Sequence, residues 1–166
     1  MGVVRDCLQR LASSAEVQTM YERILVAVDG SPPSTLALDE AVKLAKEQRA
    51  KLRIVHVVDE GLVVSPNVPS FNLGETDPAQ AERGRSILQG ACERARRGGL
   101  EPEAILLDEM THQPGRRIVE QATEWPADLI VCGTHGRRGV RRLLLGSDSE
   151  YVLRHTPVPM LLVRAK

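Results

Sequence analysis

The sequence predicts one α/β domain, built on a doubly wound, parallel five-stranded sheet with helices on both faces. Its 166 residues are the length of a single ordinary domain. Five short apolar runs alternate with segments of helical periodicity, a pattern typical of a parallel sheet. Each run is apolar throughout, as expected of strands buried on both faces. The right-handedness of strand–helix–strand crossovers then leaves a Rossmann-like topology.

The first strand is expected at 23–28 (RILVAV), where apolar and β-branched residues precede the turn-forming sequence DGS. Ser34 is predicted to cap the following helix, because a serine hydroxyl can accept a first-turn N–H. A second strand is expected at 52–58 (LRIVHVV). Residues 59–77 carry two prolines and no clear periodicity. They predict a long irregular connection, which is usually either a functional cover or mobile.

The second half of the chain repeats the alternation of helix and strand. Residues 78–97 are rich in Ala, Arg and Glu and stop at Gly98-Gly99, a typical helix C-terminus. Pro114 favours the start of another helix, since proline fits the first turn. The elements expected after residue 97 are, in chain order, a strand at 104–107, a helix at 115–124, a strand at 128–132, a helix at 147–154 and a strand at 158–163.

The composition excludes several classes of function. Lysine and arginine total 22, as do aspartate and glutamate, so no domain-wide charge attracts nucleic acid or anionic lipid. One Trp, two Tyr and one Phe offer no stacking platform for single strands. The three cysteines (Cys7, Cys92 and Cys132) are widely spaced, which predicts no disulfide framework and fits a reducing cytoplasm. No apolar run reaches about 18 residues, so we expect no membrane span and a cytoplasmic location.

Residues 1–20 differ from the rest of the chain. Val4, Leu8 and Leu11 recur at helical spacing, but charged residues interrupt the apolar run that a signal peptide requires. We therefore expect an N-terminal extension at 1–20, either mobile or a short amphipathic helix, and a domain at 21–166. Docking to a partner and targeting are the alternatives for the extension.

The segment 133–147 (GTHGRRGVRRLLLGS) carries the most chemistry. It follows a predicted strand and precedes a predicted helix, the context in which backbone N–H groups and the helix dipole bind an anion. Its glycines let the backbone approach a phosphate closely. Ser147 can cap the helix or donate its hydroxyl to a phosphate oxygen. The spacing is neither that of a Walker loop nor that of a dinucleotide motif, and a purely structural turn is the alternative.

The order Gly133-x2-Gly136-x9-Gly146-Ser147 resembles the pattern of the ATP-binding branch of the universal stress protein family. The opening ILVAVDGS at 24–31, the strand ending His56-Val57 and the closing GSDSEYVLRHTPVPMLLV at 146–163 are similar to the same family. The resemblance covers about residues 21–164. It implies an adenine-nucleotide alpha-hydrolase-like fold and a homodimer, often formed through the last strand.

The resemblance also implies a nucleotide site. Asp29 would contact the nucleoside, and Val57 would face the adenine through its backbone. From its position alone, Asp29 could equally cap the first helix or hold its loop. The residues implied for the phosphates are Gly133, Gly136, Gly146, Ser147 and Ser149. The expected ligand is ATP, together with a divalent metal such as Mg²⁺ or Mn²⁺.

Asp148 departs from the family pattern, in which this position is commonly small or apolar. Three interpretations are open. The carboxylate could point outward and favour the helix N-terminus by roughly 0.3–1 kcal/mol. It could help to hold a divalent metal that bridges the phosphates, because hard cations prefer oxygen ligands. It could also weaken ATP binding by repelling the triphosphate.

The remaining polar residues give weaker indications. The basic cluster Arg137, Arg138, Arg141 and Arg142 is either a solvated face or an attraction for phosphate or an acidic partner. His135 lies within reach of a phosphate, but no carboxylate or nucleophile is spaced to make it a general base. No other histidine has a partner at metal-ligand spacing, and Cys132 is expected to be a small core residue.

The apolar strand at 158–163 is expected at the edge of the sheet, where a bare strand is an aggregation hazard. Pairing with the same strand of a second copy would cover it and give a twofold homodimer. We therefore expect an ATP-binding, dimeric, nucleotide-responsive regulatory module of the stress response. The alternatives are a nucleotide-free interaction or protective protein and a slow ATPase, since nothing predicts efficient catalysis. AMP or a cyclic nucleotide could use the same site.

Overall fold

The structure is a computed structural model that describes residues 19–59, 78–111, 113–134 and 145–165. The predicted sheet is confirmed: five parallel strands are arranged in the order β3-β2-β1-β4-β5. The strands are β1 (Arg23–Ala27), β2 (Lys51–Asp59), β3 (Glu103–Thr111), β4 (Leu129–Gly133) and β5 (Met160–Val163). The chain thus starts at the centre of the sheet and winds outward in both directions.

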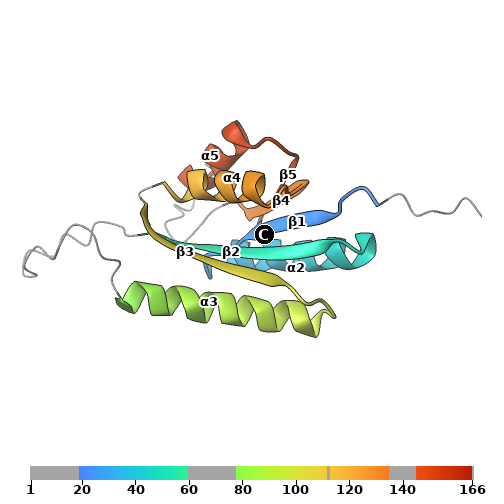
Figure 1. Cartoon of the computed structure of the whole chain (residues 1–166), viewed down its shortest axis with the longest axis horizontal. Coiled ribbons are helices and arrows are strands. Elements are labelled where there is room, and N and C mark those ends of the chain that lie inside the picture. Colours follow the sequence, from blue (N-terminus) through green and yellow to red (C-terminus); the bar gives the residue numbers. More distant parts are fainter. Residues whose placement is uncertain (1–18, 60–77, 112, 135–144, 166) are drawn as a thin grey trace, which may run out of the picture.

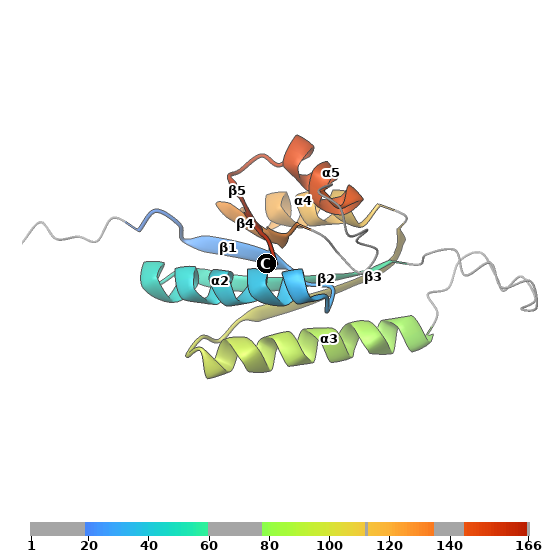
Figure 2. The same cartoon turned by 180° about the vertical axis from the view of Figure 1, so that it is seen from behind.

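Four described helices cover the two faces of the sheet. They are α2 (Pro32–Gln48), α3 (Pro78–Arg97), α4 (Pro114–Glu124) and α5 (Ser147–His155). Figures 1 and 2 show α2 and α3 on one face and α4 and α5 on the other. Each face has its own apolar core: Ile24 and Ile54 pack towards α2 and α3, whereas Leu25 and Val55 pack towards α4. This alternation along each strand is why the central residues of the strands are mostly apolar.

Most predicted boundaries lie within a few residues of the observed ones, and the differences have local causes. Ser34 is not the cap of α2. The helix begins at Pro32, and the N-cap is Ser31, whose side chain accepts a hydrogen bond from the Ser34 N–H at 3.3 Å. The proline at the first helical position accounts for the earlier start. At the end of the chain, β5 starts only at Met160 and is shorter than the predicted strand.

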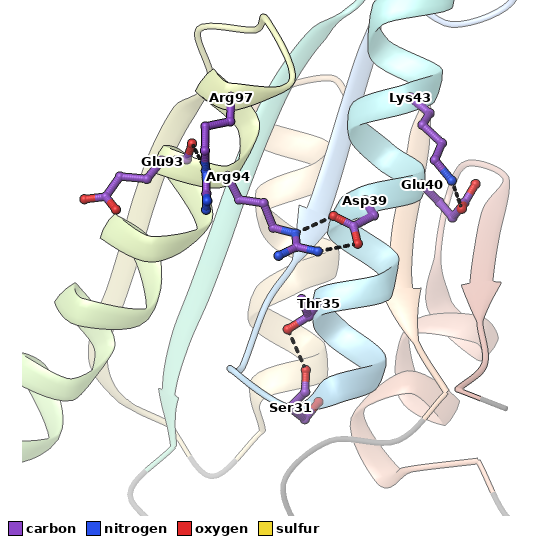
Figure 3. Close-up of polar contacts among 8 residues, drawn as sticks. All are labelled: Ser31, Thr35, Asp39, Glu40, Lys43, Glu93, Arg94 and Arg97. Atoms are coloured by element: carbon purple, nitrogen blue, oxygen red, sulfur yellow. Dashed lines mark hydrogen bonds and ion pairs between the residues drawn. The ribbon is translucent and has the colours of Figure 1, made fainter.

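An ion pair joins the two helices on one face of the sheet. The Arg94 guanidinium on α3 donates to both carboxylate oxygens of Asp39 on α2 (Figure 3). These hydrogen bonds, helped by the charge of Arg94, lower the pKa of Asp39. The pair therefore stabilises the fold at neutral pH and is lost as the pH falls through the lowered pKa. Because both side chains are partly exposed, we expect a contribution of about 0.2–1 kcal/mol.

On the opposite face, α4 and α5 approach each other closely at Gly115. A Cβ at this position would lie 2.8 Å from the Asp148 carbonyl oxygen and 2.9 Å from the Tyr151 Cβ. Only glycine leaves room for the backbone of α5 at this contact.

Among the described residues, no helix is long and apolar enough to cross a membrane.

The contact at Gly115 can be tested against a second helical glycine. We expect Gly115→Ala to lower the free energy of unfolding by about 1–3 kcal/mol, because overpacking forces the backbone of α5 to move. Gly90→Ala is the control, since a Cβ on this exposed position of α3 would meet no atom within 4 Å. It should raise stability by about 0.5–1 kcal/mol. Urea unfolding followed by circular dichroism measures both, and equal effects would contradict the close contact.

Candidate functional site

The candidate site lies where β1 and β4 end side by side. These strands are neighbours at the centre of the sheet, yet the helices that follow them, α2 and α5, pack on opposite faces. In parallel sheets such a switch point opens a crevice beyond the carboxyl ends of the strands, and ligands bind there. The predicted residues Asp29, Gly133, Gly146, Ser147 and Ser149 all come from the segments around this point.

The segment after β1 folds into a tight polar turn that starts α2. The Asp29 carboxylate accepts a hydrogen bond from the Ser31 N–H at 2.9 Å. The Ser34 hydroxyl accepts from the Asp29 N–H at 3.3 Å and donates to the Ser31 carbonyl at 3.0 Å. Thr35 donates to the same carbonyl at 3.1 Å (Figure 3). Asp29 therefore holds the loop, one of the two roles that its position allowed.

Gly133 ends β4 directly against the first turn of α2. A Cβ at this position would lie 2.8 Å from the Pro33 carbonyl carbon and 2.9 Å from the Ser34 nitrogen. These are backbone atoms of a capped helix, which cannot easily yield. Gly133 is therefore required for packing whether or not a phosphate binds, and a substitution there would disturb the fold as well as the site.

The two ends of the segment 133–147, here called the glycine loop, meet beside Gly133. The Gly146 N–H donates to the Thr134 carbonyl at 2.9 Å, and the Thr134 N–H donates to the Val163 carbonyl at 2.9 Å. The Ser149 hydroxyl donates to the Gly133 carbonyl at 2.8 Å. The N-terminus of α5 is thus fixed to the end of β4. A phosphate that accepted a hydrogen bond from the Ser149 hydroxyl would have to replace this bond.

Ser147 occupies the first helical position of α5, not the cap. The N-cap is Gly146, and within the described part of the chain no side chain caps this end of the helix. The Ser147 side chain is exposed, and no hydrogen bond of its hydroxyl occurs among the described residues. The first turn of α5 therefore presents backbone N–H groups and one hydroxyl at the switch point.

Asp148 does not point outward, which was the first of the three roles considered for it from the sequence; the metal role and the repulsion of ATP stay predictions. Its carboxylate accepts a hydrogen bond from the Gly115 N–H of α4 at 3.2 Å. The N-cap of α4, Gln113, supplies no side-chain acceptor, so the acceptor comes from the neighbouring helix instead. Asp148 thus caps α4 from the first turn of α5 and joins the candidate site to the α4–α5 contact.

The carboxylates of Asp29 and Asp148 both accept backbone hydrogen bonds, whereas Glu150, also in the first turn of α5, pairs with Arg154. Among the described residues, no group of three or more His, Cys, Asp or Glu side chains could hold a metal ion. Cys132, buried in β4, is a core residue as predicted. Burial, reinforced by the charges of Asp148 and Asp29, raises the pKa of its thiol to about 12. The thiol is therefore protonated at neutral pH and unreactive.

Val57 lies on β2, next to the end of β1. The residue before it, His56, is buried, and its Nδ1 atom lies 2.6 Å from the Val28 carbonyl oxygen. The sequence patterns assigned no role to His56. A histidine between two valines of a predicted buried strand is the feature that could have pointed to one, because a buried polar side chain needs a partner.

Several predicted features lie outside the described residues. They are Gly136, His135, the four arginines at 137–142, His112, Cys7, most of the extension at 1–20 and most of the connection at 59–77. Their predicted roles stay predictions.

Comparisons with known proteins agree with the fold. The model of the universal stress protein family matches residues 20–164, and this chain belongs to that family. Universal stress protein YxiE of Bacillus subtilis is 37% identical over 151 residues, which cover 87% of this chain and all of that protein. The resemblance read from the glycine loop and the strand ends is thereby confirmed.

Solved structures show the same architecture. A member of the family from Burkholderia pseudomallei is 35% identical, with a TM-score of 0.67 over 89% of this chain and 98% of that one. A universal stress protein in complex with cAMP is 27% identical, with a TM-score of 0.65 over 88% of this chain and 99% of that one.

The role of Asp148 can be tested by removing its acceptor. Asp148→Ala leaves the Gly115 N–H without a cap, so we expect the free energy of unfolding to fall by about 0.5–2 kcal/mol. Asp148→Asn keeps an acceptor oxygen of the same shape and should retain most of the stability. Urea unfolding of both variants measures the difference. An outward-pointing charge would predict the same small loss for both.

Proposed function

We propose that this chain is an ATP-binding universal stress protein that acts as a homodimeric, nucleotide-responsive regulatory module in the cytoplasm. The observation that carries the proposal is the first turn of α5. Its N–H groups have no side-chain cap among the described residues, and they are fixed beside Gly133 at the switch point. The backbone N–H groups at the start of a helix and the positive end of its dipole favour a phosphate at this position.

The phosphate-binding residues would be Gly133, Gly136, Gly146, Ser147 and Ser149, and Asp29 and Val57 would contact the nucleoside. The relative solved with cAMP supports an adenine nucleotide as the ligand class. Asp29 and Asp148 accept backbone hydrogen bonds, so most of the contacts to Mg²⁺ or Mn²⁺ would come from the phosphates. This is the usual way in which Mg²⁺ accompanies a nucleotide.

Nucleotide binding is best tested at Ser147, because Gly133 is needed for packing. Mg-ATP at about 100 times its dissociation constant should stabilise the protein by roughly 2.7 kcal/mol and raise the unfolding midpoint clearly. Ser147→Asp should abolish this shift by repelling the phosphates. It should leave the nucleotide-free protein as stable as the parent, since an acidic residue suits a helix N-terminus. Differential scanning fluorimetry measures the midpoints.

Ser86→Asp is the matched control, because it places the same charge on an exposed position of α3. It should keep the full shift with Mg-ATP. AMP and cAMP, tested beside ATP, identify the preferred ligand. An unchanged midpoint of the parent protein with all three nucleotides would contradict the proposal, and so would a full shift in Ser147→Asp.

The homodimer would form through β5, which lies at one edge of the described sheet. The Ile130 N–H donates to the Pro159 carbonyl, and the Thr134 N–H donates to the Val163 carbonyl. Alternate residues of β5 therefore face β4, and the backbone groups of Met160 and Leu162 point away from the sheet. These groups are available to a second copy of the strand.

Leu162→Pro should produce a monomer, because proline removes an outward N–H but no hydrogen bond to β4. Leu162→Ala is the control: it also loses the leucine side chain but keeps the N–H, and it should remain a dimer. Sedimentation velocity gives the mass of each. If both variants have the parent's dimeric mass, β5 is not the strand that pairs.

A further inference from the structure

The backbone of β1 leaves β2 one residue before the candidate site. The parallel register between the two strands ends with Ala27 opposite Val55. The Val28 N–H still donates to the Val55 carbonyl at 2.9 Å, so the backbone groups of Val55 face β1. In a parallel pair, alternate residues direct their backbone groups to the same neighbour. Val57, two residues later, therefore also faces β1, at a point where β1 no longer pairs.

A side chain takes the hydrogen bond that would have continued the ladder. In a regular parallel pair, the Val57 N–H would donate to the Val28 carbonyl and extend the register by one pair. Instead, the imidazole Nδ1 of His56 lies 2.6 Å from this carbonyl oxygen. A carbonyl only accepts, so the bond requires the proton on Nδ1. His56 thereby ends the β1–β2 ladder.

The imidazole is held in this position by α3. His56 is 4% exposed. A Cβ on Gly84 of α3 would lie 2.9 Å from the Cδ2 atom of the ring and 2.7 Å from the Leu106 Cδ1. The ring therefore lies directly against α3 at Gly84, where only a residue without a side chain leaves room for it. A buried side chain with a fixed orientation and a short hydrogen bond is suited to positioning backbone.

We infer that His56 is a positioning residue for base recognition: by holding the Val28 carbonyl, it keeps the N–H and C=O of Val57 out of the sheet and available to a ligand. The inference rests on the proposed nucleotide site and explains how this site would read the base. A neighbouring donor and acceptor match adenine, which presents an amino donor beside a ring acceptor. Guanine presents a carbonyl acceptor in place of that amino group, and matches poorly.

An apolar side chain at position 56 would change this arrangement. Without the imidazole, the Val28 carbonyl would be buried and unpaired, which is costly. The Val57 N–H is the nearest donor that the parallel geometry offers. The β1–β2 ladder would then extend by one pair, and the Val57 N–H would no longer be available to the base.

The first test is amide hydrogen exchange of the nucleotide-free protein, measured by NMR. In the parent protein, we expect the Val57 amide to exchange much faster than the Val55 amide, which is the internal control within the ladder. In His56→Phe, which keeps a flat ring but no donor, the Val57 amide should become protected. In His56→Asn, whose side-chain amide can donate from about the position of Nδ1, it should exchange as in the parent.

The second test is the choice of base, measured as dissociation constants for Mg-ATP, Mg-GTP and inorganic tripolyphosphate with Mg²⁺. In His56→Phe, the ratio of the dissociation constant for Mg-GTP to that for Mg-ATP should fall about tenfold, which is the effect of about one hydrogen bond to the base. This variant should bind tripolyphosphate within about twofold of the parent, because the phosphate half of the site is unchanged. His56→Asn should restore the preference for ATP.

The outcomes separate the inference from the proposed function. If the parent binds no nucleotide, the proposed function fails, and with it the role in base recognition. The exchange experiment then still decides whether His56 keeps Val57 out of the ladder. If the Val57 amide of the parent is as protected as that of Val55, or if His56→Phe keeps the parent's preference for ATP over GTP, the inference is overturned.

Discussion

The contact between the end of β4 and the first turn of α2 is the constraint on which the candidate site depends. Gly133 lies against the backbone of Pro33 and Ser34, with no room for a side chain. This contact brings the segments after β1 and β4 together, although a hundred residues separate them in the chain. The helices then leave on opposite faces, so the strand order places a switch point between them.

Short polar side chains fix the backbone around this switch point. Asp29, Ser31 and Ser34 hold one another in the turn before α2. Ser149 ties α5 to β4, and Asp148 ties it to α4. Carboxylates beside a phosphate site would normally oppose an anion. The Asp29 and Asp148 carboxylates are directed to N–H groups, which would reduce their cost to a phosphate at the proposed site and leave recognition mainly to the backbone.

The same principle extends to His56, whose imidazole replaces a hydrogen bond of the sheet. Sequence patterns pointed to the loops after β1 and β4, because glycines and small hydroxyl residues cluster there, and the structure brings the described parts of these loops together. They did not show that Asp29 accepts a hydrogen bond from its own turn or that Ser149 donates one to the end of β4. Nor did they show that Asp148 caps α4 rather than its own helix, α5. The partner of Ser149 is 16 residues away in the chain, and the partner of Asp148 is 33 residues away. The hydrogen bond of Asp29 is local, but it depends on a turn geometry that the sequence does not fix.

The alternation of strands and helices and the parallel sheet could be predicted without the structure, because apolar runs and helical periodicity are local properties of the chain. The family could be identified in the same way, from the local spacing of the glycines. The sequence also placed α3 and α4 to within a residue, since Pro114 and Gly98-Gly99 are strong boundary residues. Only the tertiary structure decided which polar groups meet. The α4–α5 contact at Gly115, the end of the β1–β2 ladder and the orientation of His56 under α3 arise from packing between distant elements, which no local pattern encodes.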